Sequence, residues 1–393
     1  MNNKKSKNFT RREFVKVSTI TGLGVAVSPL LFNNNYAFTK RIADGKPATN
    51  INDALLYPKN ENSMPGKFPG KVIQTNHQNC IVDNKIVYDA AYDMVAKGML
   101  ALTGAKTLKD AWLMFVDAND RIGLKVNPVA GPTLSTSVEI TQAVIKQLEE
   151  AGISRNNLII WDRREQQLFE AGFTNDAFPG IKIIGTECAD EKGSMYDENG
   201  VLYGEQRIDK NWYYWADCED KYDAETLPYM INEGKYSYFT KIATEMVDKI
   251  INIPILKNAG ASVTLCLKNL AYGVITNTGR LHKDLWGETC AEVCAFPPLR
   301  DKVVLNIVDG LKGCFNGGPG ANPQFFTNYN AVLVGTDPVA VDRIGYEIVI
   351  KKRIEEGIQK EESPRGRAFM NIAENLKLGI ADLDKISHQK IDL

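Results

Sequence analysis

Short runs of apolar, often β-branched residues recur along the chain and alternate with longer stretches whose apolar residues are spaced three or four positions apart. The first pattern predicts buried β-strands, and the second predicts helices that bury one face. We expect strands at residues 71–75, 121–126, 158–161, 181–184, 250–256, 302–308 and 331–334. Helices are expected at residues 88–102, 136–150, 240–249 and 284–295. Two more are expected, one that follows the strand 158–161 and ends near residue 171, and one that begins at residue 338. This alternation predicts an α/β fold with a mainly parallel sheet covered by helices.

An aromatic-rich insertion divides this pattern. Residues 188–240 are dominated by Asp, Glu, Tyr and Trp, as in the run from Asn211 to Trp215. We expect an insertion or lid with a few antiparallel strands. Its rings either stack on a ligand, serve an interface, or pack the insertion onto the main domain. The expected organisation is a linker or arm (38–70), a first α/β half (71–187), the insertion, and a second half that carries the site (241–393).

The N-terminus has the pattern of an export signal. Residues 10–16, TRREFVK, fit the twin-arginine motif (S/T)-R-R-x-F-x-K, and a short Gly-containing apolar stretch follows at 17–32. This stretch is too short for a stable membrane span. We expect cleavage after Ala37, passage through the twin-arginine translocase and a periplasmic mature protein without a stable membrane span. The alternative is an accidental Arg pair before a buried helix.

The net charge and the spacing of the cysteines limit the classes of ligand and cofactor that the sequence supports. The net charge of −1 over 393 residues gives no support for nucleic-acid binding through a broad basic surface. Seven cysteines are scattered without a C-x-x-C pair, so neither a ferredoxin ligand run nor a zinc ribbon is supported. Cys290 and Cys294 are four residues apart, and their simplest interpretation is as small core residues. A divalent metal or an iron–sulphur cluster stays open as a cofactor.

Candidate site residues follow the ends of expected strands. Lys257 ends the run 250–256, and Lys268, Asn269 and His282 come soon after it. Ligands of open α/β sheets bind where parallel strands end. Lys125 and Asn127 close the run 121–126 and alternate onto the same side of it.

Several acidic residues have similar positions. Asp162, Asp309 and Asp337 each follow an expected strand. If the sheet is parallel, its strand ends share one edge, and these acids can converge with the lysines and with His282. Asp337 is also a natural cap for the helix that begins at Pro338.

These residues also carry a family resemblance. The matching motifs are Asn252-x-Pro254-x-x-Lys257, Thr264, Lys268-Asn269, Gly273, His282, Asp120-x-x-Gly123-x-Lys125-x-Asn127, Asp309-Gly310, Gly317-Gly318-Pro319 and Asp337-Pro338-Val339-Ala340-x-Asp342. From about residue 72 to about residue 345 the chain resembles the domain-of-unknown-function family 362. That family has no settled activity, and some members carry ferredoxin modules that this chain lacks. The resemblance therefore implies site positions and leaves the reaction open.

The first functional hypothesis is an enzyme that acts on a small anionic molecule. Its substrate-binding residues are Lys125, Asn127, Lys257 and Asn269, and its catalytic residues are Lys268, His282 and Asp309, with Asp337 as a metal ligand. His282 is the natural general acid or base because its ordinary pKa is about 6.5. One alternative is an exported redox protein whose cluster is held by Cys266, Cys290, Cys294 and Cys314. Another is a non-catalytic periplasmic binding protein that uses the aromatic insertion.

Overall fold

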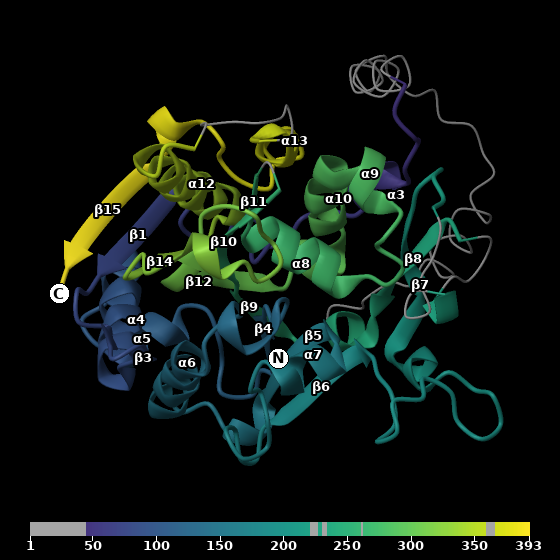
Figure 1. The fold of residues 1–393 in the computed structure, drawn as a ribbon, viewed down its shortest axis with the longest axis horizontal. Helices are drawn as coiled ribbons and strands as arrows, with labels where there is room; N and C mark the ends of the chain where they lie inside the picture. The colour runs from purple at the N-terminus through teal and green to yellow at the C-terminus, as the bar shows by residue number, and fades with distance from the viewer. Residues whose placement is uncertain (1–44, 221–226, 230–233, 261, 359–365) are drawn as a thin grey trace, which may run out of the picture.

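The computed structural model describes residues 45–220, 227–229, 234–260, 262–358 and 366–393, and its centre is one large sheet (Figure 1). The main path runs in the order β15-β1-β14-β12-β9-β4-β5-β6. These strands are β1 (Lys71–Asn76), β4 (Ile122–Val126), β5 (Leu158–Arg164), β6 (Lys182–Glu187), β9 (Lys249–Ile253), β12 (Val303–Cys314), β14 (Ala331–Gly335) and β15 (Ser387–Asp392). All neighbours on this path pair in parallel except β14, which is antiparallel to both β1 and β12. The predicted α/β fold with a mainly parallel sheet is confirmed.

Helices cover both faces of the sheet (Figure 1). One face carries α4 (Tyr88–Thr103), α5 (Leu108–Leu113) and α6 (Val138–Ala151), and the other carries α8 (Cys266–Val274), α10 (Trp286–Glu292), α12 (Pro338–Glu355) and α13 (Ala368–Asn375). Shorter helices are α3 (Ile51–Leu55), α7 (Glu165–Glu170), α9 (Leu281–Asp284) and α11 (Pro297–Arg300). Strand residues alternate between the two cores, so Ile250 faces the α8 side and Ile251 faces the α6 side. Across the described residues, none of these helices is both long enough and apolar enough to cross a bilayer.

The expected strand 250–256 is two strands. Pro254 separates β9 from β10 (Ile255–Ala259), because proline has no N–H for the ladder. β10 continues in parallel beside the second half of β12 and turns back into β11 (Ser262–Thr264), while β13 (Phe326–Thr327) pairs with the end of β12. Lys257 therefore lies inside β10, and Asp309 lies inside β12, where it pairs with Ile255. We had expected both residues to lie at strand ends, and the structure places neither of them there.

The insertion forms the hairpin of β7 (Ile208–Trp215) and β8 (Tyr236–Thr240), which confirms the expected antiparallel strands. The Tyr213 and Tyr236 ring centroids are 5.0 Å apart, and the Tyr214 hydroxyl lies 2.9 Å from Glu292 Oε2 on α10. The hydrogen bond from Tyr214 to Glu292 favours the interpretation that the rings pack the insertion onto the main domain. The expected helix 240–249 is wrong, because only a π-helical turn at Ile242–Met246 follows β8. A small separate hairpin joins β2 (Ile81–Val82) to β3 (Lys85–Ile86).

The reversed direction of β14 moves Asp337 away from the other strand ends. Asp337 follows β14, so it lies at the edge where the parallel strands begin. Its carboxylate caps α12, accepting from the N–H groups of Val339 and Ala340 at 3.0 and 2.9 Å, and it accepts from Gly70 and Ile380 at 3.0 Å each. The expected convergence of Asp337 with the lysines is wrong, and its four N–H donors leave little room for the predicted metal.

Candidate functional site

Four buried asparagines form a continuous line of hydrogen bonds between the sheet and α8. Asn127 Nδ2 donates to Asn269 Oδ1 at 3.0 Å, and Asn269 Nδ2 donates to Asn252 Oδ1 at 2.8 Å. Asn252 Nδ2 in turn donates to Asn306 Oδ1 at 2.9 Å. No member is more than 4% exposed. We call these four residues the amide chain.

The direction of the amide chain is set at its two ends. Asn306 Nδ2 donates to the carbonyl oxygens of Gly335 and Thr336 at 3.4 and 3.2 Å, and a carbonyl oxygen can only accept. At the other end, the Oδ1 atoms of Asn127 and Asn269 each accept from a lysine. The orientation of every amide between these ends follows from this chemistry.

Lys125 is completely buried beside Asp162 at the end of β4. Its Nζ forms an ion pair with Asp162 and donates to Val126 O at 2.8 Å and to Asn269 Oδ1 at 3.2 Å. Burial lowers the pKa of Lys125, and the Asp162 charge opposes that shift. Gly273 of α8 runs so close to the Lys125 side chain that an added Cβ would collide with it. This contact gives the glycine of the family motif a physical reason.

Lys257 is also completely buried, but it contacts no carboxylate among the described residues. Its Nζ donates to Val129 O at 2.7 Å, Leu134 O at 3.1 Å and Asn127 Oδ1 at 3.2 Å. Burial lowers the pKa of Lys257 to about 7, and repulsion by Lys268 acts in the same direction. Lys257 thus fastens the loop 127–137, which connects β4 to α6, onto β10.

Asp309 fastens the other end of the same loop. Its Oδ2 accepts from the backbone N and the hydroxyl of Ser137, at 2.7 and 2.6 Å, and its Oδ1 accepts from Leu311 N at 3.1 Å. Ser137 is the N-cap of α6. Burial raises the pKa of Asp309, and the Ser137 hydrogen bonds oppose that shift. Among the described residues no hydrogen bond or ion pair joins Asp309 to Lys268 or His282, so the structure does not bring this predicted catalytic residue to them.

Lys268 differs from the other two lysines in its surroundings. Its Nζ lies 5.7 Å from the Tyr272 ring centroid and 5.6 Å from that of Trp286, and the residue is 8% exposed. No described residue accepts a hydrogen bond from this ammonium or forms an ion pair with it. Burial lowers the pKa of Lys268; the nearby Cys290 opposes this shift, and the charge of Arg163 adds to it. This cation–π environment stabilises a cation only modestly compared with an anionic partner.

His282 lies next to Lys268, with its ring centroid 4.5 Å from that of Tyr272. Its Nδ1 is 3.1 Å from Thr278 O, and because a carbonyl can only accept, Nδ1 carries the proton and Nε2 is left as an acceptor. Packing against protein lowers the pKa of His282 to about 4, and the Lys268 charge contributes to the shift. His282 is exposed, so a neutral imidazole is available at the surface.

Arg163 completes this group and was not among the predicted site residues. It donates to Thr278 Oγ1, and its Nε lies 3.6 Å from Glu187, whose carboxylate also lies 3.1 Å from Arg164 Nε. One carboxylate therefore contacts two guanidinium groups at this end of β5. Its position directly after Asp162 at the end of a strand is the signal that could have identified it.

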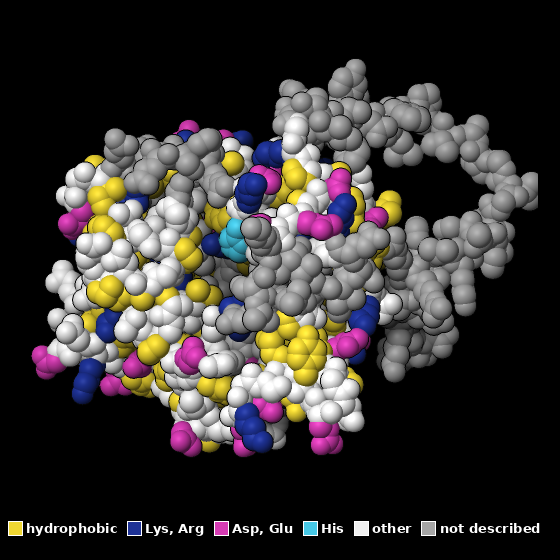
Figure 2. All heavy atoms as spheres, turned by 45° about the vertical axis from the view of Figure 1, so that its right-hand side comes forward, with side chains coloured by type: hydrophobic (Ala, Val, Ile, Leu, Met, Phe, Trp, Pro, Cys, Tyr) yellow, Lys and Arg dark blue, Asp and Glu magenta, His cyan; other side chains and the backbone are white. Residues whose placement is uncertain are grey.

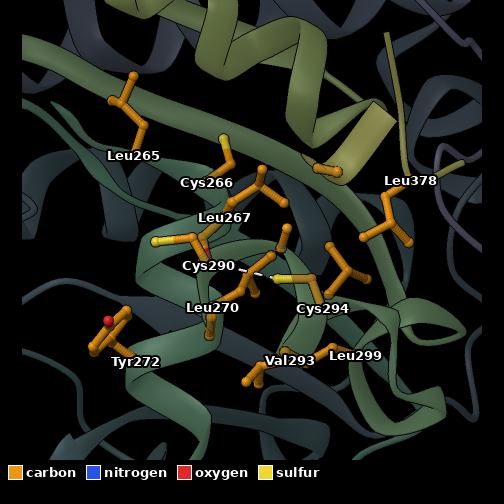
Figure 3. Close-up of a cluster of buried hydrophobic side chains, with 14 of the residues drawn as sticks. Leu265, Cys266, Leu267, Leu270, Tyr272, Cys290, Val293, Cys294, Leu299 and Leu378 are labelled. Atoms are coloured by element: carbon orange, nitrogen blue, oxygen red, sulfur yellow. Dashed lines mark hydrogen bonds between the residues drawn. The ribbon is translucent and has the colours of Figure 1, made fainter. Parts of the chain in front are cut away.

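The cysteines do not assemble into a ligand set. Cys266, Cys290 and Cys294 pack among Leu267, Leu270 and other apolar side chains between α8 and α10 (Figure 3). Cys314 belongs to a different cluster. Within the part of the chain that the structure describes, no three His, Cys, Asp or Glu side chains are placed to share a metal ion. The four-cysteine cluster expected under the redox hypothesis is therefore not formed by these residues.

Two open depressions lie over the insertion, one lined by residues including Asp209 and Lys241 and the other by residues including Cys188 and Arg207. Neither includes a member of the amide chain or of the Lys268 group. Acidic and basic side chains are interspersed over the described residues of the face in Figure 2, in keeping with the net charge of −1.

Comparison with known proteins gives the family but no activity. No curated protein matches the chain. A crystal structure of a structural-genomics target from Thermotoga maritima is similar at 8% sequence identity and a TM-score of 0.35, with 68% of this chain and 59% of that chain covered. That likeness is too weak to support an argument about function. Residues 122–347 match the sequence model of the domain of unknown function DUF362, and the chain belongs to that family.

Proposed function

We propose that this protein is an enzyme that acts on a small anionic molecule beside α8, at the edge where β4 and β5 end. The observation that supports this most is the Lys268 ammonium, which is largely buried and has no hydrogen-bond or ion-pair partner among the described residues. An ammonium in such a place is costly unless it is paired or neutral. A ligand carboxylate or phosphate would supply the missing acceptor.

The surrounding residues divide into two roles. Lys268 and Arg163 bind the anion, and His282, neutral with an available Nε2, accepts or returns a proton. Lys125, Asn127, Lys257 and Asn269 already have partners inside the protein. They are positioning residues in this proposal, because they hold α8 and the loop 127–137 in place.

Ligand-dependent thermal stabilisation tests the binding half of the proposal. The full chain is heated with inorganic phosphate and with a panel of mono- and dicarboxylates at constant ionic strength. An anion present at about 100 times its Kd adds about 2.7 kcal/mol to the stability. We expect a higher Tm for the wild type and for Lys351→Met, a control whose lysine is exposed, and no change for Lys268→Met. A Tm rise that persists in Lys268→Met, or a wild type that no anion stabilises, contradicts the proposal.

Turnover separates an enzyme from a binding protein. An anion that stabilises the protein is followed by nuclear magnetic resonance over time with the wild type and with His282→Ala. The proposal expects conversion by the wild type, retained binding by His282→Ala, and conversion lowered by about 10²–10⁴-fold, the usual contribution of a general acid or base. Binding without conversion in the wild type favours the binding-protein alternative.

We further propose that the twin-arginine route exports the protein to the periplasm. The support is the sequence of residues 10–16, which lie outside the described residues. Replacing Arg11 and Arg12 together by Lys should keep the protein in the cytoplasmic fraction with its signal uncleaved. Unchanged periplasmic recovery of the double variant would exclude this route.

A further inference from the structure

Lys268 has the surroundings of a reactive amine. It lies between the faces of Tyr272 and Trp286, it has no hydrogen-bond acceptor among the described residues, and Arg163 is near enough to repel its charge. Lysines become nucleophiles when they are desolvated in an apolar pocket or placed beside another cation. Both conditions are met at this one side chain.

We propose that Lys268 forms an imine with the carbonyl carbon of a small oxo acid whose carboxylate is bound by Arg163. This inference rests on the proposed function and narrows its anion to a class that carries both a carboxylate and a ketone or aldehyde. A plain carboxylate or phosphate would bind between Arg163 and the Lys268 ammonium without forming a covalent bond.

The structure distinguishes Lys268 from the two neighbouring buried lysines. Lys125 is held by the Asp162 carboxylate, and Lys257 is held by three oxygen acceptors. Both are 0% exposed, so a substrate carbonyl cannot reach either amine without opening the protein. Lys268 keeps 8% exposure and makes only ring contacts.

The step balances without any redox partner. The neutral Lys268 amine adds to the carbonyl carbon, and a proton passes from nitrogen to oxygen to give a carbinolamine. The carbinolamine then loses its hydroxyl group and the remaining nitrogen proton as water, leaving a C=N bond. His282 Nε2 takes the proton from nitrogen and delivers one to the departing hydroxyl, because its Nδ1 proton is held by Thr278 O.

The electrostatics of the group favour this step. Burial and the Arg163 charge both lower the pKa of Lys268, which increases the fraction of amine able to attack. The Arg163 guanidinium attracts the substrate carboxylate. The same charge stabilises the negative oxygen that develops during addition.

Reductive trapping tests the imine directly. The full-length protein is incubated with pyruvate and sodium cyanoborohydride, digested, and analysed by mass spectrometry. We expect one carboxyethyl group on the peptide that contains Lys268, present in the wild type and in Lys351→Met and absent in Lys268→Met. Labelling of the peptide with exposed Lys351 measures the background, and mapping on the wild type does not depend on any variant folding.

A second arm tests the carboxylate contact. Arg163→Gln should lower the rate of labelling by pyruvate about tenfold, which corresponds to the loss of one charge-assisted hydrogen bond, and leave labelling by neutral acetone unchanged. Equal loss with both probes overturns the assigned role of Arg163. Label confined to Lys125 or Lys257, or label at Lys268 no faster than at Lys351, overturns the imine. The imine can fail while an anion still stabilises the wild type but not Lys268→Met, and in that case the proposed function stands without the imine. If no anion stabilises the wild type, the proposed function fails together with the imine.

Discussion

Replacing Asn269 by Leu should destabilise the protein strongly, because this residue occupies the centre of the amide chain. The change removes the acceptor of Asn127 Nδ2 and the donor to Asn252 Oδ1, and no other described group contacts either atom. Lys125 keeps its ion pair and its bond to Val126 O. Each buried polar atom left without a partner costs about 1–3 kcal/mol, so two such atoms predict a loss of about 2–6 kcal/mol.

Urea denaturation followed by tryptophan fluorescence measures this loss. Asn371→Leu is the matched control, since Asn371 is exposed on α13 and should change the free energy of unfolding by no more than about 0.5 kcal/mol. A loss below about 1 kcal/mol for Asn269→Leu would show that the two amides find other partners and that the chain is not continuous.

A double-mutant cycle tests the connection between neighbouring members. Asn269→Leu leaves Asn252 Oδ1 without a donor, and Asn252→Leu removes that same oxygen. In the double variant this unsatisfied atom is absent. The double variant should therefore be more stable than the sum of the single changes by about 0.5–3 kcal/mol. Simple additivity of the two changes would refute a direct hydrogen bond between them.

Three further predictions use other contacts of the site. Gly273→Ala should lower the free energy of unfolding by about 1–3 kcal/mol, because its methyl group would collide with Lys125. Gly279 has open space around it, so Gly279→Ala should cause no such loss. Equal thermal stability of the two variants would argue against the close approach of α8. The pKa of Lys257 in the folded protein is about 7, below its ordinary 10.5, so the unfolded chain binds more protons between these values and stability should rise with pH from 7 to 10. Urea midpoints across that range should rise less steeply in Lys257→Met, and parallel curves would exclude Lys257 as a source of the slope. Asp337→Ala should lose at least about 2 kcal/mol in the same assay by removing the acceptor of four N–H groups, with anion-dependent stabilisation intact; loss of a bound metal instead would restore the predicted metal role.

Local pattern was enough to predict the sheet and the closeness of some candidate residues. The period-two alternation of the run 121–126 placed Lys125 and Asn127 on one side, and both reach Asn269. The family spacing placed Asn269 and Lys257 near them, and the structure joins all four through hydrogen bonds and shared neighbours. These predictions succeeded because side chains alternate between the two faces of a strand, so the position of one residue fixes the side of its neighbours.

The two misplaced acids depended on information that local pattern does not contain. Whether β14 runs with or against β12 is decided by pairing between distant segments, and this direction alone moved Asp337 to the other edge. Asp309 was expected to follow its strand because the apolar run stops at Val308. Its carboxylate is instead satisfied by Ser137, and it lies an odd number of positions from Asn306, which puts it on the α6 face, away from α8.

The division of the predicted residues into positioning and binding groups comes from α8. Neighbouring residues of a helix point about 100° apart, so Lys268 and Asn269 cannot serve the same surroundings. Asn269 faces the sheet and is held from both sides, while Lys268 faces α10 and the end of β5, where no described side chain accepts its hydrogen bonds. Asp342 fixes the helix by accepting from the N–H groups of Cys266 and Leu267 at 2.6 and 3.0 Å. Because no described residue pairs with the Lys268 ammonium, its partner is the component that the proposed ligand has to supply.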